Sequence, residues 1–264
     1  MPPAQPRRPR SRLKAPKFAH LAPWILTAFA AVLLEVGLKK FAIPDYLVPR
    51  PTQVLSVLRA DADILASQTL ATLMEWVLGL GLSLALALPL AFLSFRSVWA
   101  AHVLRPFIVV SQSVPYLCFA PMLLIWMGLG MATKIVLVVL TCAFPIALLT
   151  EQGLTAARNE YELVVAMLQM SPRKAFFQVY FPAALPSFFS GIRISATYAF
   201  VSAVLSELIG SEKGLGVYLL RAQNSYRTDR VVAAVALIVA ISLATTWSVD
   251  KIRSKVVFWN EARR

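Results

Sequence analysis

The sequence contains few of the residues that carry most enzyme chemistry. Among its 264 residues, 13 are acidic, two are histidine and two are cysteine. His20 and His102 show no metal-ligand spacing, and no pair of nucleophile and base is apparent, which argues against an intramembrane enzyme. Cys118 and Cys142 fall within apolar runs, where cysteine behaves as a small apolar side chain. No phosphate-binding loop pattern is present. We therefore expect no cofactor, no metal site and no catalytic residue.

Charge is also scarce, and most of it is positive. Hydrophobic residues make up 58% of the sequence and charged residues 15%. This apolar content exceeds that of a normal soluble domain, so lipid is the expected solvent for much of the chain. The 26 Lys and Arg give a net charge of +13, but they cluster between apolar runs. Such spacing is typical of charges that set membrane topology, and it argues against nucleic acid as a partner.

Six segments are long and apolar enough to be membrane spans. A helix needs about 20 residues to cross about 30 Å of hydrocarbon, although tilt relaxes this requirement. The expected spans are 23–41, 76–95, 106–133, 135–150, 187–209 and 231–249. Lys134 would lengthen the fourth span by extending its ammonium to the interface. The sequence thus predicts an all-α polytopic membrane protein, with a six-helix domain over residues 21–264.

The positions of the basic residues predict the orientation. Lys and Arg are more frequent in the segments that a cytoplasmic N-terminus would place inside. We therefore expect a protein of the bacterial inner membrane with both termini on the cytoplasmic side. Residues 1–20, rich in Pro and Arg, are expected to form a disordered basic tail that touches anionic lipid. Residues 42–75 would lie outside, with a short amphipathic helix from Thr52.

The inner segment 151–186 is expected to hold two short helices that meet at a corner. Residues 159–170 place apolar side chains on one face of the first helix. Ser171 followed by Pro172 is typical of an N-cap and the first turn of the second helix. The apolar ridge would either pack on the protein's own surface or bind a partner.

Several spaced motifs together resemble the permeases of binding-protein-dependent ABC importers, in the nitrate, sulfonate and taurine branch. The matching stretches, which follow one another over nearly the whole chain after residue 20, are LVPRPTQV (47–54), SVPYLCFAPMLLIWMGLG (113–130), FPIALLTEQGL (144–154), FPAALP (181–186) and GSEKGLGVYL (210–219). The chain departs from the family pattern at the corner, where Glu-Ala-Ala is replaced by Leu163-Val164-Val165 and glycine by Gln169. Gln169 would then adopt a less favourable turn or mark a different elbow.

The resemblance implies an ATPase-coupling loop and a set of partners. The implied coupling residues are Met167, Leu168, Gln169, Met170, Ser171, Pro172, Arg173, Lys174 and Phe176. The implied partners are a cytoplasmic ABC ATPase dimer, which would hydrolyse ATP, a second permease subunit in a homodimer or close heterodimer, an extracytoplasmic substrate-binding protein and the membrane lipids.

Polar side chains of the fifth expected span form a candidate pathway for a small polar solute. The candidates, which recur at three or four residues, are Ser195, Tyr198, Ser202 and Ser206, followed by Glu207. Small hydroxylated residues also serve helix packing, and that alternative stays open. Glu207 would face the pathway, close an outer gate with a basic partner or reach water. Arg193 would reach lipid headgroups or act in gating. The glycine-rich residues 210–216 would form a flexible turn.

The substrate is suggested by resemblance alone. SQSVP (111–115) and residues 188–229 look most similar to permeases for the pyrimidine precursor of thiamine. Nitrate, sulfonates, taurine and riboflavin-like solutes remain open. The alternative function is an ion-coupled secondary transporter, although no internal repeat is visible and the carboxylates of Glu35 and Glu207 stand near span ends.

Overall fold

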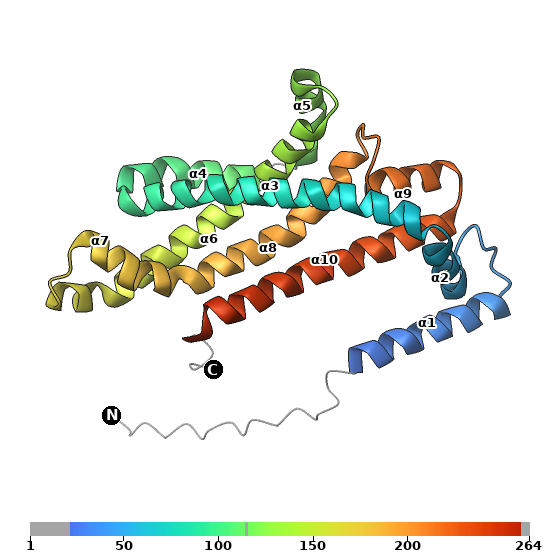
Figure 1. Ribbon diagram of the computed structural model, residues 1–264, viewed down its shortest axis with the longest axis horizontal. Helices are drawn as coiled ribbons and strands as arrows, with labels where there is room; N and C mark the ends of the chain where they lie inside the picture. Colours follow the sequence, from blue (N-terminus) through green and yellow to red (C-terminus); the bar gives the residue numbers. More distant parts are fainter. Residues whose placement is uncertain (1–21, 114–115, 260–264) are drawn as a thin grey trace, which may run out of the picture.

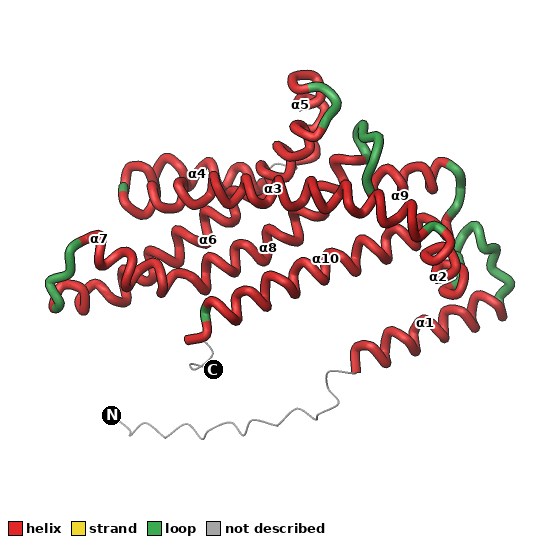
Figure 2. Tube along the Cα trace, in the orientation of Figure 1, coloured by secondary structure: helices red, strands yellow, loops and turns green. Residues whose placement is uncertain are grey.

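The computed structural model describes residues 22–113 and 116–259, and all the regular structure in these ranges is helical. Figure 1 shows long helices lying side by side, and Figure 2 shows that short connections join them. The elements are α1 (Ala22–Lys40), α2 (Pro51–Ala60), α3 (Ala62–Arg96), α4 (Val98–Ser113), the 3₁₀ turn η1 (Tyr116–Phe119), α5 (Ala120–Met127), α6 (Met131–Met167), α7 (Pro172–Ala175), the π-helical turn η2 (Phe176–Tyr180), α8 (Phe181–Glu207), α9 (Leu215–Asn224) and α10 (Thr228–Val256).

Four stretches of the described chain are long and apolar enough to cross a membrane. They are α3, α6, the stretch from α7 through α8 (Pro172–Glu207), and α10. The all-α membrane class is therefore confirmed. Neither α1 nor the segment from α4 to α5 is among these four, so the count of six spans stays a prediction.

The expected span 106–133 is wrong as a single helix. α4 ends at Ser113, and α5 then projects away from the bundle (Figure 1). Pro121 lies in the first turn of α5, where its missing N–H costs nothing. Gly128, with φ of +74°, ends α5 after eight residues. A hydropathy window overlooks both interruptions because the side chains on either side are apolar.

Two helices extend well beyond the expected spans. α3 begins at Ala62 and not near residue 76, and α6 runs for 37 residues to Met167. The stretch 159–167 is therefore the end of α6 and not a separate short helix. Hydropathy locates the part of a helix that lies in lipid, whereas the helix itself can continue into water, and both helices also continue through an internal proline, Pro89 in α3 and Pro145 in α6.

Small side chains bring the central helices into close contact. The core of α3, α6, α8 and α10 is rich in alanine, including Ala87, Ala147 and Ala199. At Gly79 of α3, an added methyl group would overlap the side chain of Val138 on α6. Close backbone approach allows extensive van der Waals contact, which is what holds helices together where lipid removes the hydrophobic driving force.

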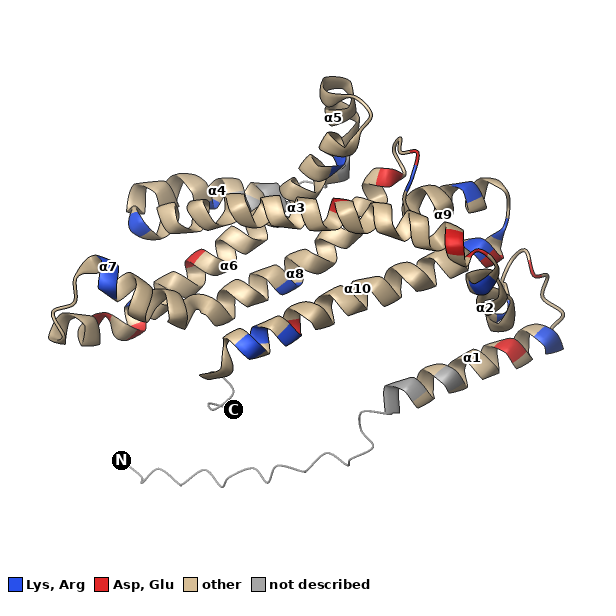
Figure 3. Cartoon of the chain, in the orientation of Figure 1, with Lys and Arg blue, Asp and Glu red and all other residues tan. Residues whose placement is uncertain are grey.

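Charged residues gather toward the two ends of the bundle (Figure 3). One end, here called the α7 end, carries α7 and the C-terminal end of α10, and the opposite α9 end carries α2 and α9 (Figure 1). Ser171 lies directly before α7, and Lys213 lies two residues before the start of α9. The two residues therefore stand at opposite ends of the protein.

Candidate functional site

The elbow, defined as residues 167–174, is built by a left-handed turn that ends α6. The N–H of Gln169 donates to the carbonyl of Ala166 at 3.0 Å, and the N–H of Met170 donates to that of Val165 at 3.2 Å. This pair of bonds is a Schellman motif, in which the residue that donates the first bond is left-handed. Gln169 supplies it with φ of +47°. The expectation that this position adopts a turn ordinarily given to glycine is confirmed.

The second half of the elbow begins as the sequence predicts. Ser171 is the N-cap residue of α7 and Pro172 occupies the first turn. The carbonyl of Ser171 accepts from the N–H of Ala175 at 2.9 Å, while the serine side chain makes no capping bond. α7 passes through η2 into α8 without a loop. The elbow thus connects two long helices directly.

The coupling residues differ in exposure. Met167 and Leu168 are 73% and 66% exposed at the tip, although both are apolar. The other exposed members are Gln169, Ser171, Pro172, Arg173 and Lys174, and the half-buried members are Met170 and Phe176. The ring of Phe176 lies 5.2 Å from that of Phe92 on α3, so this side chain braces the elbow against its own subunit.

The hydroxyl stripe of α8 lies mostly inside the subunit. Ser195, Ser202 and Ser206 are buried. The hydroxyl of Ser195 donates to a carbonyl of α6 at 3.2 Å, that of Ser202 shares a hydrogen bond with Thr141 at 3.2 Å, and that of Ser206 donates within α8. Tyr198 differs because it is 52% exposed. The stripe therefore joins α8 to α6 and presents one aromatic residue outward.

Glu207 is held by hydrogen bonds and is 1% exposed. One carboxylate oxygen accepts from the hydroxyl of Thr72 on α3 at 2.6 Å, and the other accepts from the N–H of Gly216 at 2.6 Å. The expectations that Glu207 reaches water or pairs with a basic partner are both wrong. The carboxylate instead fixes the start of α9 to the end of α8.

The glycine-rich turn before α9 is fixed in place, which corrects the expectation of a flexible turn. The N–H of Gly214 donates to the side chain of Gln68 at 2.5 Å, and that of Leu215 donates to Thr72 at 3.0 Å. Gly214 has φ of +130°, and an added methyl group would overlap the Glu207 carboxylate. Glycine is therefore required both by the backbone and by the close approach.

A protein-family model described as "Binding-protein-dependent transport system inner membrane component" matches residues 77–257. The match includes most of α3, the elbow, the hydroxyl stripe and the turn before α9, and it covers more than half of the sequence. The chain belongs to this family. The permease is thus a membrane component of a transport system, as the spaced motifs indicate.

Two relatives extend this finding over almost the whole permease. A "Probable ABC transporter permease protein" of Haemophilus influenzae is 34% identical over 89% of this chain and 96% of its own length. The "Formylaminopyrimidine transport permease protein ThiX" of Halalkalibacterium halodurans is 26% identical over 92% of this chain and 98% of its own length. The resemblance to ABC importer permeases that the motifs indicate is confirmed.

The fold of the permease is also found among solved structures. An inward-facing structure of the MetNI methionine ABC transporter contains a chain that matches with a TM-score of 0.63 at 18% identity. The match covers 73% of this permease and 96% of that chain. At this identity the likeness concerns the fold.

Several ion pairs of the permease were not predicted from the sequence. Lys134 on α6 pairs with the buried Glu75 on α3 and does not extend to an interface. Arg193 pairs with Asp250 on α10 at 3.3 Å. Opposite charges that lie in separate spans give no local signal, because their partners are about 60 residues away along the sequence. A search for opposite charges at matching depths of different spans would have suggested both pairs.

A further polar group ties α9 to the start of α3. The hydroxyl of Tyr218 donates to the carboxylate of Asp61 at 2.7 Å, and Arg230 pairs with the same carboxylate at 2.9 Å. Burial raises the pKa of Tyr218 above its usual value, and the hydrogen bond to Asp61 raises it further. The phenol therefore stays protonated and keeps donating at physiological pH.

Proposed function

We propose that this permease is the transmembrane subunit of an ATP-driven importer, and that the elbow receives the stroke of a cytoplasmic ABC ATPase. The observation that carries the proposal is the pair of exposed apolar side chains, Met167 and Leu168, on a rigid turn at the end of α6. Exposed apolar tips beyond the lipid are costly in water unless a partner covers them. Arg173 and Lys174 provide a basic rim around them.

The length and continuity of α6 explain how the stroke would travel. A helix of 37 residues is about 55 Å long, and α6 runs as one helix from Met131 to Met167, with Pro145 inside it. The hydrogen-bonded turn at Gln169 and the ring contact of Phe176 with Phe92 restrict movement of the elbow relative to the spans. Movement of the elbow would therefore tilt α6 and α8 together, and this rigid-body motion would open one side of the pathway.

The partners follow from the proposed docking of the elbow on an ATPase. An ATPase dimer offers two equivalent docking grooves, so two permease subunits, as a homodimer or close heterodimer, would each insert one elbow. An extracytoplasmic binding protein would deliver the solute at the α9 end, where the turn before α9 is fixed by Glu207. In this proposal both termini and the elbow lie on the cytoplasmic side of a bacterial inner membrane.

The pathway would lie along the exposed side of α8. Tyr198 is the member of the hydroxyl stripe that is open to a second subunit or a solute. Ser195 and Ser202 bind α6 and Glu207 binds Thr72, so these three hold α8 in place from behind, while Ser206 is buried and bonds within α8. An aromatic ring with a hydroxyl group suits a compact aromatic solute, by stacking and hydrogen bonding. We therefore propose a thiamine pyrimidine precursor as the solute, with nitrate, sulfonates and taurine as the competing solutes to be tested.

The experiment replaces Leu168 with glutamate. A charge buried in a desolvated groove without a partner costs several kcal/mol, so ATPase binding and uptake should both fall at least tenfold. Ser254→Glu is the matched control, because it places the same charge on an exposed position of α10 at the same end of the bundle. The measurements are co-purification of the ATPase and ATP-dependent uptake of a labelled pyrimidine, at equal membrane levels of permease.

Equal ATPase recovery and normal uptake with Leu168→Glu would contradict the proposal, since the elbow would then serve only its own subunit. Uptake that follows an ion gradient in vesicles that lack the ATPase would contradict the importer function as a whole. The solute is tested separately, by competition of unlabelled taurine, nitrate and sulfonate against the pyrimidine.

A further inference from the structure

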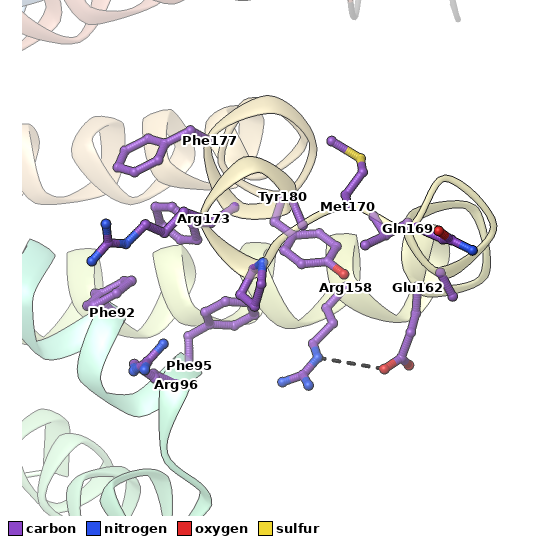
Figure 4. Close-up of a pocket in the computed structure, with 15 residues that line it drawn as sticks. Phe92, Phe95, Arg96, Arg158, Glu162, Gln169, Met170, Arg173, Phe177 and Tyr180 are labelled. Atoms are coloured by element: carbon purple, nitrogen blue, oxygen red, sulfur yellow. Dashed lines mark ion pairs between the residues drawn. The ribbon is translucent and has the colours of Figure 1, made fainter.

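A pocket of about 730 Å³ lies between the elbow and the end of α3. Figure 4 shows three arginines around it, which come from different elements: Arg96 from the end of α3, Arg158 from α6 and Arg173 from α7. The pocket shares Gln169, Met170, Pro172 and Arg173 with the elbow, but the exposed tip residues Met167 and Leu168 do not line it. It can therefore hold an occupant besides the partner that covers the tip.

The charge of the pocket is strongly positive. Glu162 is the acidic residue among those that line it, and its carboxylate lies 3.9 Å from the guanidinium of Arg158, both side chains being more than half exposed. Within residues 22–113 and 116–259, neither Arg96 nor Arg173 has an ion-pair partner. Two planar guanidinium groups without a carboxylate favour an anion, and phosphate matches their fork of N–H donors.

The wall of the pocket is aromatic. The ring of Phe176 lies 5.2 Å from that of Phe92 and 6.1 Å from that of Phe95. The π-helical turn η2 carries Phe176 at its start, and such turns are often found at functional sites. The guanidinium of Arg158 lies 5.8 Å from the ring centre of Phe95. The pocket thus combines cationic groups with apolar rings, which suits a ligand with an anionic head and an apolar body.

The place of the pocket in the fold indicates where such a ligand comes from. Arg96 is the last residue of α3, one of the four helices apolar enough to cross the membrane. The pocket therefore begins where the apolar length of α3 ends, and phospholipid phosphates would lie at this level if α3 spans the membrane. Phe92, one turn earlier, is 43% exposed and lines the pocket, so an acyl chain that follows the headgroup could contact its ring. A soluble phosphate would gain nothing from these aromatic residues.

We propose that this pocket binds the phosphate of an anionic phospholipid from the inner leaflet, with Arg96 and Arg173 as its main ligands. Basic pockets between the ends of membrane helices favour anionic headgroups. Because Arg96 belongs to α3 and Arg173 to the elbow, a bound phosphate would connect the two and stabilise their contact. The proposal goes beyond the importer function and depends on it only for the orientation of this end.

The experiment titrates purified, delipidated permease with dioleoyl phosphatidylglycerol and with dioleoyl phosphatidylcholine, and native mass spectrometry counts the bound lipid. Wild type should prefer phosphatidylglycerol. The double variant Arg96→Gln, Arg173→Gln should bind it about 25-fold more weakly, from about fivefold for each arginine. Lys251→Gln, Lys255→Gln is the matched control, since it removes two charges from α10 at the same end and lines no part of the pocket. The control should keep the wild-type affinity.

Three outcomes would overturn the proposal. The first is an equal affinity of both double variants for phosphatidylglycerol. The second is displacement of phosphatidylglycerol by millimolar inorganic phosphate, which would make the pocket a site for soluble phosphate. The third is a loss of ATPase co-purification with unchanged lipid binding in Arg96→Gln, Arg173→Gln, which would assign the pocket to the ATPase. The titration uses neither ATPase nor solute, so its result is independent of the Leu168→Glu experiment.

Discussion

Single residues with an unusual backbone conformation determine where this permease turns. Gln169 adopts a left-handed conformation, with φ of +47°, that costs a residue with a Cβ about 1 kcal/mol or more. The Schellman bonds of Ala166 and Val165 hold it there. The chain must turn at this corner of the elbow, so the backbone of Gln169 is strained. Its polar side chain also lines the pocket that Arg96, Arg158 and Arg173 surround.

Replacing Gln169 with glycine should stabilise the permease, because glycine adopts the left-handed region without steric cost. We expect the free energy of unfolding to rise by about 1 kcal/mol and the melting temperature in detergent to rise by a few degrees. Gln169→Ala is the control, since it removes the same side chain but retains the Cβ. A melting temperature that rises equally in both variants would show that the amide side chain, and not the backbone, is the source of the strain.

At the scale of whole elements, the sequence predicts what local chemistry determines. Ser171 and Pro172 begin α7 as expected, because the extended backbone of Ser171 and the missing N–H of Pro172 act within one turn. The break between α4 and α5 was missed, since apolar residues continue through it. The environment of Glu207 was also missed, because Thr72 lies 135 residues away along the chain. Contacts of that range depend on how α3 and α8 pack, and periodicity within one helix contains no information about them.

The attachment of α9 can be tested at Gly214. Gly214→Ala should destabilise the permease by about 2–4 kcal/mol, because the new methyl group meets the Glu207 carboxylate. This overlap disturbs the hydrogen bond from Gly214 to Gln68 and the one from Gly216 to Glu207. The melting temperature should fall by several degrees. Gly81→Ala on α3, where an added methyl group meets nothing within 4 Å, should leave it unchanged or higher. Equal melting temperatures of the two variants would mean that the turn before α9 moves freely.

At the scale of the molecule, the fold separates two kinds of construction. The α9 end is fixed by buried hydrogen bonds, including those of Glu207 and the Tyr218 to Asp61 pair. The α7 end carries exposed apolar residues and two arginines, Arg96 and Arg173, that have no carboxylate partner in the part of the chain that the structure describes. A closed end and an end open to partners are what a permease requires if force enters from one side of the membrane and solute from the other.

The orientation of these ends gives the last prediction. Positive-inside counting predicts that the α7 end is cytoplasmic. Ser171 and Lys213 stand at opposite ends and both are exposed, so each can report the side on which its end lies. In a Cys118→Ser background, which leaves only the fully buried Cys142, we would introduce Ser171→Cys or Lys213→Cys. A maleimide that does not cross membranes should label Lys213→Cys on intact cells, and Ser171→Cys only after permeabilisation. Labelling of Ser171→Cys on intact cells, with Lys213→Cys protected, would invert the permease and remove the elbow from any cytoplasmic ATPase.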